Sequence, residues 1–259
     1  MTYRHCRYQV DGEILTLTID RPEVLNALHP EAHAELADAF DRYRDDALLR
    51  VAIVSGGEGR AFCVGTDLKA LAATGDHRKP ATGFGGITRR FDLWKPVIAA
   101  VNGLCLGGGA EIVAACDLAL AADDAQFALS EPRVGLAALG GGALQRLARQ
   151  MPMKDAMWLV LTGNRIDAHE ARRIGLVNRV VPRAELLARA HELARELLEC
   201  APLALEASKQ VMLQSLAEPD LQAAMDAHYA AAERMLASDD AREGPLAFAE
   251  KRRPRWTGH

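Results

Sequence analysis

The distribution of hydrophobic and polar residues predicts short strands that alternate with amphipathic helices. Residues 13–20 and 51–55 are rich in β-branched side chains, as strands are. Between them, residues 30–43 repeat Ala, Leu and Phe at helical spacing, which predicts a helix with one hydrophobic face. Residues 95–101 are almost continuously hydrophobic, as in a strand that is buried on both sides. This part of the chain therefore indicates an α/β fold.

The same alternation continues beyond residue 101. A turn at residues 102–109 leads into a short hydrophobic helix at residues 108–115. Strands are then expected at residues 117–122 and 126–130, and an Asp-Asp pair marks the turn between them. Helices and strands thus alternate throughout this half of the chain.

After residue 143 the pattern becomes mostly helical. Stretches of Ala, Leu, Glu and Arg, separated by Pro and Gly, predict helices at residues 184–200, 203–216 and 221–238. Residues 72–90 differ from the rest because they contain four glycines and little periodicity. They are the best candidate for a mobile loop, and a plain surface connection is the alternative.

Composition places the chain among globular proteins. Of its 259 residues, 49% are hydrophobic and 25% are charged, which fits one large domain or one domain with an appendage. No hydrophobic run approaches the roughly 18 residues that a membrane helix requires, and residues 1–10 lack the hydrophobic core of a signal peptide. We therefore expect a cytoplasmic protein with no membrane partner.

The overall charge argues against a nucleic-acid partner. The formal net charge is −4 and the isoelectric point is about 6.1. The cluster from Lys251 to Arg255 is an exception, because it is strongly basic. It either meets a phosphate or forms a solvated helix end, where cations are favoured in any case.

Cysteine and histidine positions predict no structural metal. The five cysteines show neither CxxC nor zinc-finger spacing, so buried free thiols are expected. His29 and His33 are four residues apart on an expected helix, but no third ligand lies nearby in a known motif. We interpret them as a surface pair. The cysteines are Cys6, Cys63, Cys105, Cys116 and Cys200.

The segment KPVIAAVNGLCLGGGAEIVAACD, residues 95–117, carries the most chemical information. Its strand leads to three glycines, Gly107 to Gly109, at the start of a hydrophobic helix. The first turn of a helix has free N–H groups and a positive dipole end, so it suits an oxygen that becomes negative during a reaction. The spacing does not match a nucleotide-binding loop or a GxSxG nucleophile turn. Close packing of helix on strand is an equally good explanation of the glycines.

Two glutamates lie beside these glycines in the predicted fold. Glu111 occupies the first turn of a helix that is otherwise made of Ala, Ile, Val and Cys, where a buried carboxylate is costly without a purpose. Glu131 follows the strand expected at residues 126–130, and strand ends often carry functional groups. The alternatives are a helix-dipole interaction for Glu111 and a solvated turn position for Glu131.

Six segments in a fixed order carry the most specific signal of the chain: RPEVLNAL (21–28), AFCVGTDLK (61–69), KPVIAAVNGLCLGGGAEIVAACD (95–117), AQFALSEPRVGL (125–136), LTGNRIDAHEARRIGLVNRVV (161–181) and AFAEKRRPRW (247–256). Through these segments the whole chain resembles the crotonase (enoyl-CoA hydratase/isomerase) family. The family's fold serves hydratases, isomerases, dehalogenases, decarboxylases and hydrolases of acyl-CoA, so the resemblance is more specific for the family than for the reaction.

The resemblance implies the architecture and the assembly. It implies an α/β fold with a crotonase-like spiral of ββα units over residues 1–190, which holds the coenzyme A and catalytic sites. A helical C-terminal region, residues 191–259, is expected to mediate oligomerisation into a homotrimer or a hexamer built from two trimers. The expected partner is an acyl-CoA substrate, with no nucleic acid.

The resemblance also implies the reacting groups. Glu111 and Glu131 match the two catalytic glutamates, and the backbone N–H groups of Thr66 and Gly108 match the oxyanion hole for the thioester carbonyl. Thr66 stands where the family often has alanine, which is tolerable because the donor is the backbone. Two backbone donors would stabilise an enolate without a metal, so no cofactor is expected.

Further positions are implied to bind the substrate. The loop of Leu139, Gly140 and Gly141 matches the acyl end of the site, but it lacks a proline that is common in family hydratases, so the acyl group stays open. Lys251 is expected near a phosphate or the adenine, either of its own subunit's ligand or of an adjacent subunit's. The remaining substrate or coenzyme A positions are Leu25, Ala27, Phe62, Val64, Gly65, Asp67, Leu68, Lys69 and Gly107.

Having both glutamates favours hydration of a 2-enoyl-CoA, a lyase reaction. Addition of water across a double bond requires a base for the water and an acid for the α-carbon, and two carboxyls can share these tasks. Neighbouring carboxyls repel as anions, so one is expected to keep its proton. The alternatives are Δ3-Δ2 enoyl-CoA isomerisation, another acyl-CoA reaction through the same enolate, and a non-catalytic RNA-binding module that uses the basic tail.

Overall fold

The computed structural model describes residues 3–259 and contains two sheets that share their connections. The larger sheet has the order β1-β2-β3-β5-β7-β10, in which β1 and β2 are antiparallel and the other neighbours are parallel. The smaller sheet has the order β4-β6-β8-β9. The strands of the larger sheet are β1 (Cys6–Asp11), β2 (Ile14–Ile19), β3 (Val51–Ser55), β5 (Val97–Val101), β7 (Leu118–Ala122) and β10 (Arg179–Val181).

Each turn of the chain contributes one strand to each sheet. β3, β5 and β7 of the larger sheet are followed by β4 (Ala61–Cys63), β6 (Leu104–Leu106) and β8 (Gln126–Ala128) of the smaller one. After β4 and β6 come α2 (Leu68–Thr74) and α3 (Gly108–Ala115). β9 (Ile166–Asp167) pairs antiparallel with β8 and closes the smaller sheet. The expected spiral of ββα units is therefore confirmed.

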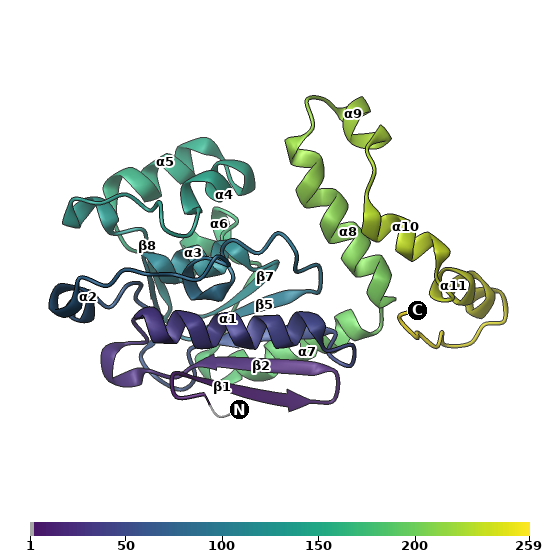
Figure 1. The fold of residues 1–259 in the computed structure, drawn as a ribbon, viewed down its shortest axis with the longest axis horizontal. Coiled ribbons are helices and arrows are strands. Elements are labelled where there is room, and N and C mark those ends of the chain that lie inside the picture. Colours follow the sequence, from purple (N-terminus) through teal and green to yellow (C-terminus); the bar gives the residue numbers. More distant parts are fainter. Residues whose placement is uncertain (1–2) are drawn as a thin grey trace.

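Helices cover the sheets and complete the core. α1 (Pro30–Asp45) begins after His29, whose ring accepts a hydrogen bond from the Ala32 N–H, and it lies in front of the larger sheet (Figure 1). α7 (Leu186–Leu198) runs across residue 190 and buries Ala190 and Ala194 in the core. The other helices of this part are α4 (Ala143–Gln150), α5 (Met153–Thr162) and α6 (Ala168–Arg173). The division of the chain at residue 190 stays a prediction.

The last four helices form an arm beside the core (Figure 1). α8 (Pro202–Gln214) is joined to the core by Lys209, whose Nζ lies 2.8 Å from Asp117 Oδ2 and 3.1 Å from the carbonyl oxygen of Lys95. α11 stands at the opposite end of the molecule from α2. The other helices of the arm are α9 (Leu221–Asp226), α10 (Ala230–Ala237) and α11 (Asp240–Ala249).

The prediction of a single helix at residues 221–238 was wrong, because the helical conformation is interrupted between α9 and α10. Tyr229 is buried and its hydroxyl donates a 2.7 Å hydrogen bond to the carbonyl of Ala224, which folds the break back onto α9. Gln210 of α8 then accepts a hydrogen bond from the Ala231 N–H at 2.7 Å and caps the new helix. Tertiary contacts therefore override a helical pattern that contains neither glycine nor proline.

Two further expectations need correction. Cys200 is exposed, whereas the other four cysteines are buried free thiols as expected. The segment Phe84 to Arg90 is not a surface connection, because Phe84, Ile87 and Thr88 are almost fully buried. It includes the 3₁₀ helix η2 (Phe84–Gly86), which packs against α1.

No helix within residues 3–259 is long and hydrophobic enough to cross a bilayer. Over the same residues, no group of three or more His, Cys, Asp or Glu side chains has the arrangement of a metal site.

Gly75 and Gly86 have nearly the same backbone φ angle but different surroundings. Alanine substitutions at these positions therefore distinguish the cost of close packing from the cost of backbone strain. Gly75 has φ +67° with nothing within 4 Å of a β-carbon, whereas a β-carbon on Gly86, at φ +68°, would lie 2.5 Å from the Ala37 nitrogen. We predict that Gly75→Ala lowers the free energy of unfolding by about 1 kcal/mol and Gly86→Ala by at least about 3 kcal/mol. Urea unfolding measures both values, and equal losses would contradict the packing of η2 on α1.

Candidate active site

Glu111 projects from the first turn of α3 and is buried, with only 3% of its surface exposed. Its Oε1 accepts hydrogen bonds from the N–H groups of Gly141 at 2.7 Å and Ala143 at 3.4 Å. A β-carbon on Gly141 would lie 2.7 Å from Glu111 Oε2, so only glycine fits there. The loop expected at the acyl end therefore lies directly against the first glutamate, and its two donors match a carboxylate, which only accepts.

Glu131 lies at the start of the 3₁₀ helix η3 (Glu131–Val134), just after β8. Its Oε2 is buried and has no hydrogen-bond partner within residues 3–259. Burial raises the pKa of this carboxyl above 4.5, and the nearby charge of Glu111 adds to the shift. This environment therefore shifts the carboxyl toward its protonated form.

The glycine turn brings Glu131 and the start of α3 together. Gly107 has φ +52°, and a β-carbon there would lie only 3.1 Å from Glu131 Oε1. Gly109 is packed even more closely, because its β-carbon would lie 2.0 Å from the carbonyl oxygen of Cys63. The end of β4 and the beginning of α3 can approach this closely only without side chains.

Thr66 and Gly108 each present an unused backbone donor beside this contact. Gly108 is the first residue of α3, so its N–H has no acceptor within the helix. In the part of the chain that the structure describes, the Thr66 N–H donates to no protein acceptor. A β-carbon on Gly65 would lie 3.1 Å from the Gly108 nitrogen, which shows how near the two segments are. The arrangement suits an oxyanion hole, and this role stays a prediction.

A buried ion pair fixes the residue that follows Thr66. Arg21 Nη1 lies 3.1 Å from Asp67 Oδ2, and both side chains are about nine-tenths buried. Leu28 and Thr66 form an isolated parallel bridge, in which the Leu28 N–H donates to Gly65 at 2.8 Å and the Asp67 N–H donates to Leu28 at 2.9 Å. This network holds the loop that carries the expected coenzyme A contacts. The sequence pattern did not predict the role of Arg21.

Leu25 and Asn26 adopt the left-handed backbone conformation in the same loop, with φ of 56° and 57°. The Asn26 side-chain amide donates to the carbonyls of Gly56 and Ala61, and its oxygen accepts from the Arg21 N–H at 2.8 Å. Asparagine tolerates this conformation better than most residues. The asparagine of the RPEVLNAL segment was the one signal for this turn.

The expected coenzyme A residues do not all face solvent. Leu68 and Lys69 are exposed at the start of α2, whereas the side chain of Phe62 is fully buried in the core. Lys251 follows α11, and α11 lies at the opposite end of the molecule from α2 (Figure 1). The structure therefore does not bring Lys251 and Lys69 together within one chain.

His33 is not part of a surface pair, because it is only 2% exposed. Its Nδ1 accepts a hydrogen bond from the Gly85 N–H at 3.0 Å, and its ring packs edge-on against Phe84 at 4.5 Å between centroids. Burial lowers the pKa of His33 to about 3, and the charge of Lys79 adds to the shift. This neutral histidine supports η2, which in turn packs against the glycine turn.

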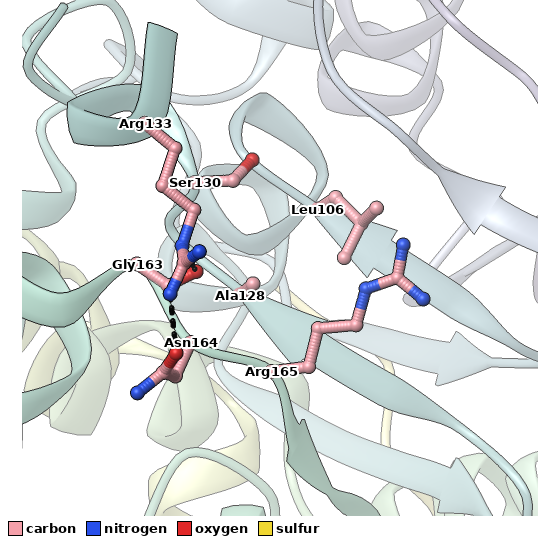
Figure 2. A pocket seen from close by; sticks show the side chains of 7 residues that line it. All are labelled: Leu106, Ala128, Ser130, Arg133, Gly163, Asn164 and Arg165. Atoms are coloured by element: carbon pink, nitrogen blue, oxygen red, sulfur yellow. Dashed lines mark hydrogen bonds between the residues drawn. The ribbon is translucent and has the colours of Figure 1, made fainter.

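A separate surface cavity of about 360 Å³ lies beside the ends of β6 and β8. Figure 2 shows that Arg133 and Arg165 extend along it, and Arg133 contacts Asn164. The cavity has no carboxylate in its lining and contains neither glutamate. We therefore place the candidate chemistry at Glu111 and Glu131. The cavity is lined mainly by Leu106, Ala128, Ser130, Arg133, Asn164 and Arg165.

Comparison with known proteins identifies the family. The model for "Enoyl-CoA hydratase/isomerase" matches residues 9–259. The chain is 45% identical over 257 residues to carnitinyl-CoA dehydratase of Salmonella arizonae, covering 96% of this chain and 97% of the relative. It is 44% identical to carnitinyl-CoA dehydratase of Escherichia coli K12, with 96% of each chain covered.

Solved structures agree with the sequence relatives. An enoyl-CoA hydratase from Mycobacterium marinum superimposes with a TM-score of 0.92 at 39% identity, covering 98% of this chain and 99% of that chain. An enoyl-CoA hydratase from Mycobacterium tuberculosis gives a TM-score of 0.89 at 40% identity, with the same coverage. The chain is thus an acyl-CoA enzyme with the crotonase fold. It belongs to the enoyl-CoA hydratase/isomerase family.

The raised pKa of Glu131 predicts a pH-dependent gain in stability for Glu131→Gln. A carboxyl whose pKa is higher in the folded than in the unfolded state stabilises the fold fully below its unfolded pKa, and this contribution is lost as pH rises. The amide does not titrate. We expect the free energy of unfolding of Glu131→Gln, relative to the parent protein, to increase from about pH 4.5 upward. A difference that is independent of pH would contradict the raised pKa of Glu131.

Proposed function

We propose that the protein catalyses the reversible addition of water to a 2-enoyl-CoA. The observation that carries this proposal is the contrast between the two glutamates. Glu111 meets two N–H donors, whereas Glu131 has an unpartnered buried oxygen and a raised pKa. A carboxylate and a carboxylic acid side by side supply the base and the acid that hydration requires. The family relatives named as hydratases and dehydratases support this reaction class.

The proposed reaction begins with the thioester oxygen at the N–H groups of Thr66 and Gly108. These donors stabilise the enolate that forms when water attacks the β-carbon. Glu111 takes one proton from the attacking water, and Glu131 gives its proton to the α-carbon. The product carries a hydroxyl on the β-carbon, while the two glutamates have exchanged protonation states. Return of one proton from Glu111 to Glu131 through solvent restores the site.

The chemistry requires no cofactor in this proposal, because backbone dipoles carry the negative charge of the enolate. Coenzyme A is part of the substrate. We place its contacts along the loop of Leu25 and Ala27 and the exposed start of α2, where Lys69 offers a cation.

We also propose assembly into a homotrimer or a hexamer through the C-terminal arm. Its helices expose large hydrophobic side chains, which a partner surface would cover. Lys251 then reaches the coenzyme A moiety of a neighbouring copy, since it follows α11, which is remote from α2 within one chain. Examples of the exposed side chains are Met212, Leu216, Leu221, Met225 and Phe248.

The acyl group named by the relatives is not carried over to this protein. Carnitinyl-CoA has a quaternary ammonium on its acyl chain. Here the ammonium group of Lys79 lies beside the loop of Gly140 and Gly141, where a cationic acyl group would be repelled. We therefore propose hydration of a 2-enoyl-CoA whose acyl group differs from the carnitinyl group.

Δ3-Δ2 isomerisation is the second candidate, because it proceeds through the same enolate but needs only one base. It would depend on Glu111 and not on Glu131. The unpartnered oxygen of Glu131 favours hydration.

Glu111→Gln and Glu131→Gln are each expected to lower the rate of crotonyl-CoA hydration at least about a hundredfold, because each removes a positioned acid or base. Loss of the conjugated thioester absorbance measures the rate, and product identification separates hydration from isomerisation. Glu23→Gln, a change at an exposed position, serves as the control. Full activity in either site variant would refute the two-carboxyl mechanism, and dependence on Glu111 alone would favour the isomerase.

Gly108→Ala is expected to disable every acyl-CoA reaction of the protein. Its β-carbon would lie 2.3 Å from the ring of Phe84, so the start of α3 must shift and its N–H leaves the oxyanion. The expected loss is about a hundredfold or more. Thr66→Ala keeps its backbone donor and should remain near the parent rate. An active Gly108→Ala protein together with an inactive Thr66→Ala protein would mean that the Thr66 hydroxyl is the working group.

Lys251→Ala should weaken binding of a complete coenzyme A thioester by up to about fivefold, since an exposed charge pair is worth little. Binding of the corresponding pantetheine thioester, which lacks the nucleotide, should not change. Titration calorimetry measures both, with Lys154→Ala as an exposed lysine control. Equal losses for the two thioesters would indicate a structural role for the tail.

A further inference from the structure

Lys79 places a positive charge next to the acyl loop. It lies between α2 and η2, and its Nζ is 5.5 Å from the centroid of the Phe84 ring. A β-carbon on Gly140 would lie 2.8 Å from Lys79 Nζ and 3.6 Å from Glu111 Oε2. The ammonium and the carboxylate oxygen are therefore separated by no more than the sum of these two distances. Lys79, Phe84, Gly140 and Glu111 thus meet at one point, although they come from three distant parts of the chain.

Within the described residues, the Lys79 ammonium makes no polar interaction that stabilises the fold. Within residues 3–259, its Nζ makes no hydrogen bond and has no carboxylate oxygen within 4.0 Å. The other cation of this corner, Arg146, behaves differently. Its guanidinium donates to the carbonyls of Gly141 at 2.9 Å and Thr88 at 2.7 Å, and it ties the acyl loop to the segment after η2. Arg146 is a structural clamp, and Lys79 remains available to a ligand.

The acyl end of the site therefore has an excess of positive charge. Lys79 and Arg146 carry two positive charges, and Glu111 carries one negative charge in the proposed mechanism. His33 is neutral, because its pKa is about 3. Glu131 lies against Gly107 rather than against Gly140 or Gly141, and the burial that raises its pKa opposes a second negative charge. A purely hydrocarbon acyl chain would gain no electrostatic interaction from this positive charge, and it would partly desolvate the Lys79 ammonium, which costs free energy.

We propose that Lys79 is a specificity-determining residue that selects acyl-CoA substrates whose acyl group ends in a carboxylate. This inference rests on the proposed function, because it places the thioester oxygen at Thr66 and Gly108 and directs the acyl chain past Glu111 toward Gly140. The terminal carboxylate accepts hydrogen bonds from the Lys79 ammonium, which the Phe84 ring holds by a cation–π contact. Lys79 is exposed, so solvent screens the pair and its effect is moderate.

The test compares glutaconyl-CoA, a 2-enoyl thioester with a terminal carboxylate, with crotonyl-CoA, which has a methyl group there. The parent protein should prefer glutaconyl-CoA in kcat/KM by about fivefold, since an exposed charge pair has a moderate effect. Lys79→Met should remove the preference and leave crotonyl-CoA hydration nearly unchanged. Arg78→Met is the matched control, because Arg78 is the adjacent exposed cation but pairs with Asp76 at 2.6 Å. It should keep the preference.

Two results would overturn the inference. One is a parent protein with no preference for the carboxylate. The other is a Lys79→Met protein that loses both substrates equally, since Lys79 would then serve Glu111 or the fold instead of the acyl group.

Calorimetry with unreactive saturated thioesters separates this inference from the proposed reaction. Glutaryl-CoA should bind about fivefold more tightly than butyryl-CoA, and only Lys79→Met should abolish the difference. If the protein hydrates neither enoyl-CoA but shows this difference, acyl selection stands and hydration is wrong. If it hydrates crotonyl-CoA and binds both saturated thioesters equally, hydration stands and acyl selection is wrong.

Discussion

The candidate site depends on the close contact between the glycine turn at the start of α3 and the end of β4. A β-carbon on Gly109 would collide with the carbonyl of Cys63, and a β-carbon on Gly65 would press on the Gly108 nitrogen. Because these glycines have no side chains, the N–H groups of Thr66 and Gly108 lie close together, and the Glu131 carboxyl packs against Gly107. The ββα spiral serves this contact, since β4, β6 and β8 are parallel neighbours whose ends meet at the same edge.

The second organising feature is electrostatic. The two glutamates come from the segments that follow β6 and β8, but their surroundings differ. Glu111 faces N–H donors from the acyl loop and from the start of α4, whereas Glu131 is partly buried near Glu111, and its Oε2 has no hydrogen-bond partner within residues 3–259. Such a difference in environment raises the pKa of Glu131 and fits the different roles that we propose for two identical side chains. Lys79 and Arg146 make the surroundings of the acyl end positive. Arg146 is hydrogen-bonded to the fold, whereas Lys79 makes no hydrogen bond within residues 3–259.

The sequence predicted the parts of the fold that local pattern determines. The helix from Gly108 to Ala115 and the strand from Val51 to Ser55 were predicted with their observed bounds. β4, β6 and β9 were not predicted, because strands of two or three residues have no measurable periodicity and exist only through pairing in the smaller sheet. The edge strand β1 was also missed, since most of its side chains face solvent.

The candidate site was predictable to a similar extent. Glu111 and Glu131 were identified from their positions in a hydrophobic helix and after a strand, together with the family resemblance. His33, Arg21 and Lys79 were not, because their roles arise from neighbours far away in the sequence. The assignment of acid and base likewise required the surroundings of each carboxyl, which no local pattern contains.

The central claim is that the N–H groups of Thr66 and Gly108 polarise the thioester carbonyl. Infrared difference spectroscopy of bound butyryl-CoA, labelled with carbon-13 at the thioester carbon, tests it directly. The account predicts that the carbonyl band of the bound thioester shifts to lower frequency than in water, and that Gly108→Ala removes most of this shift. A bound carbonyl that absorbs at its solution frequency in the parent protein would contradict the account.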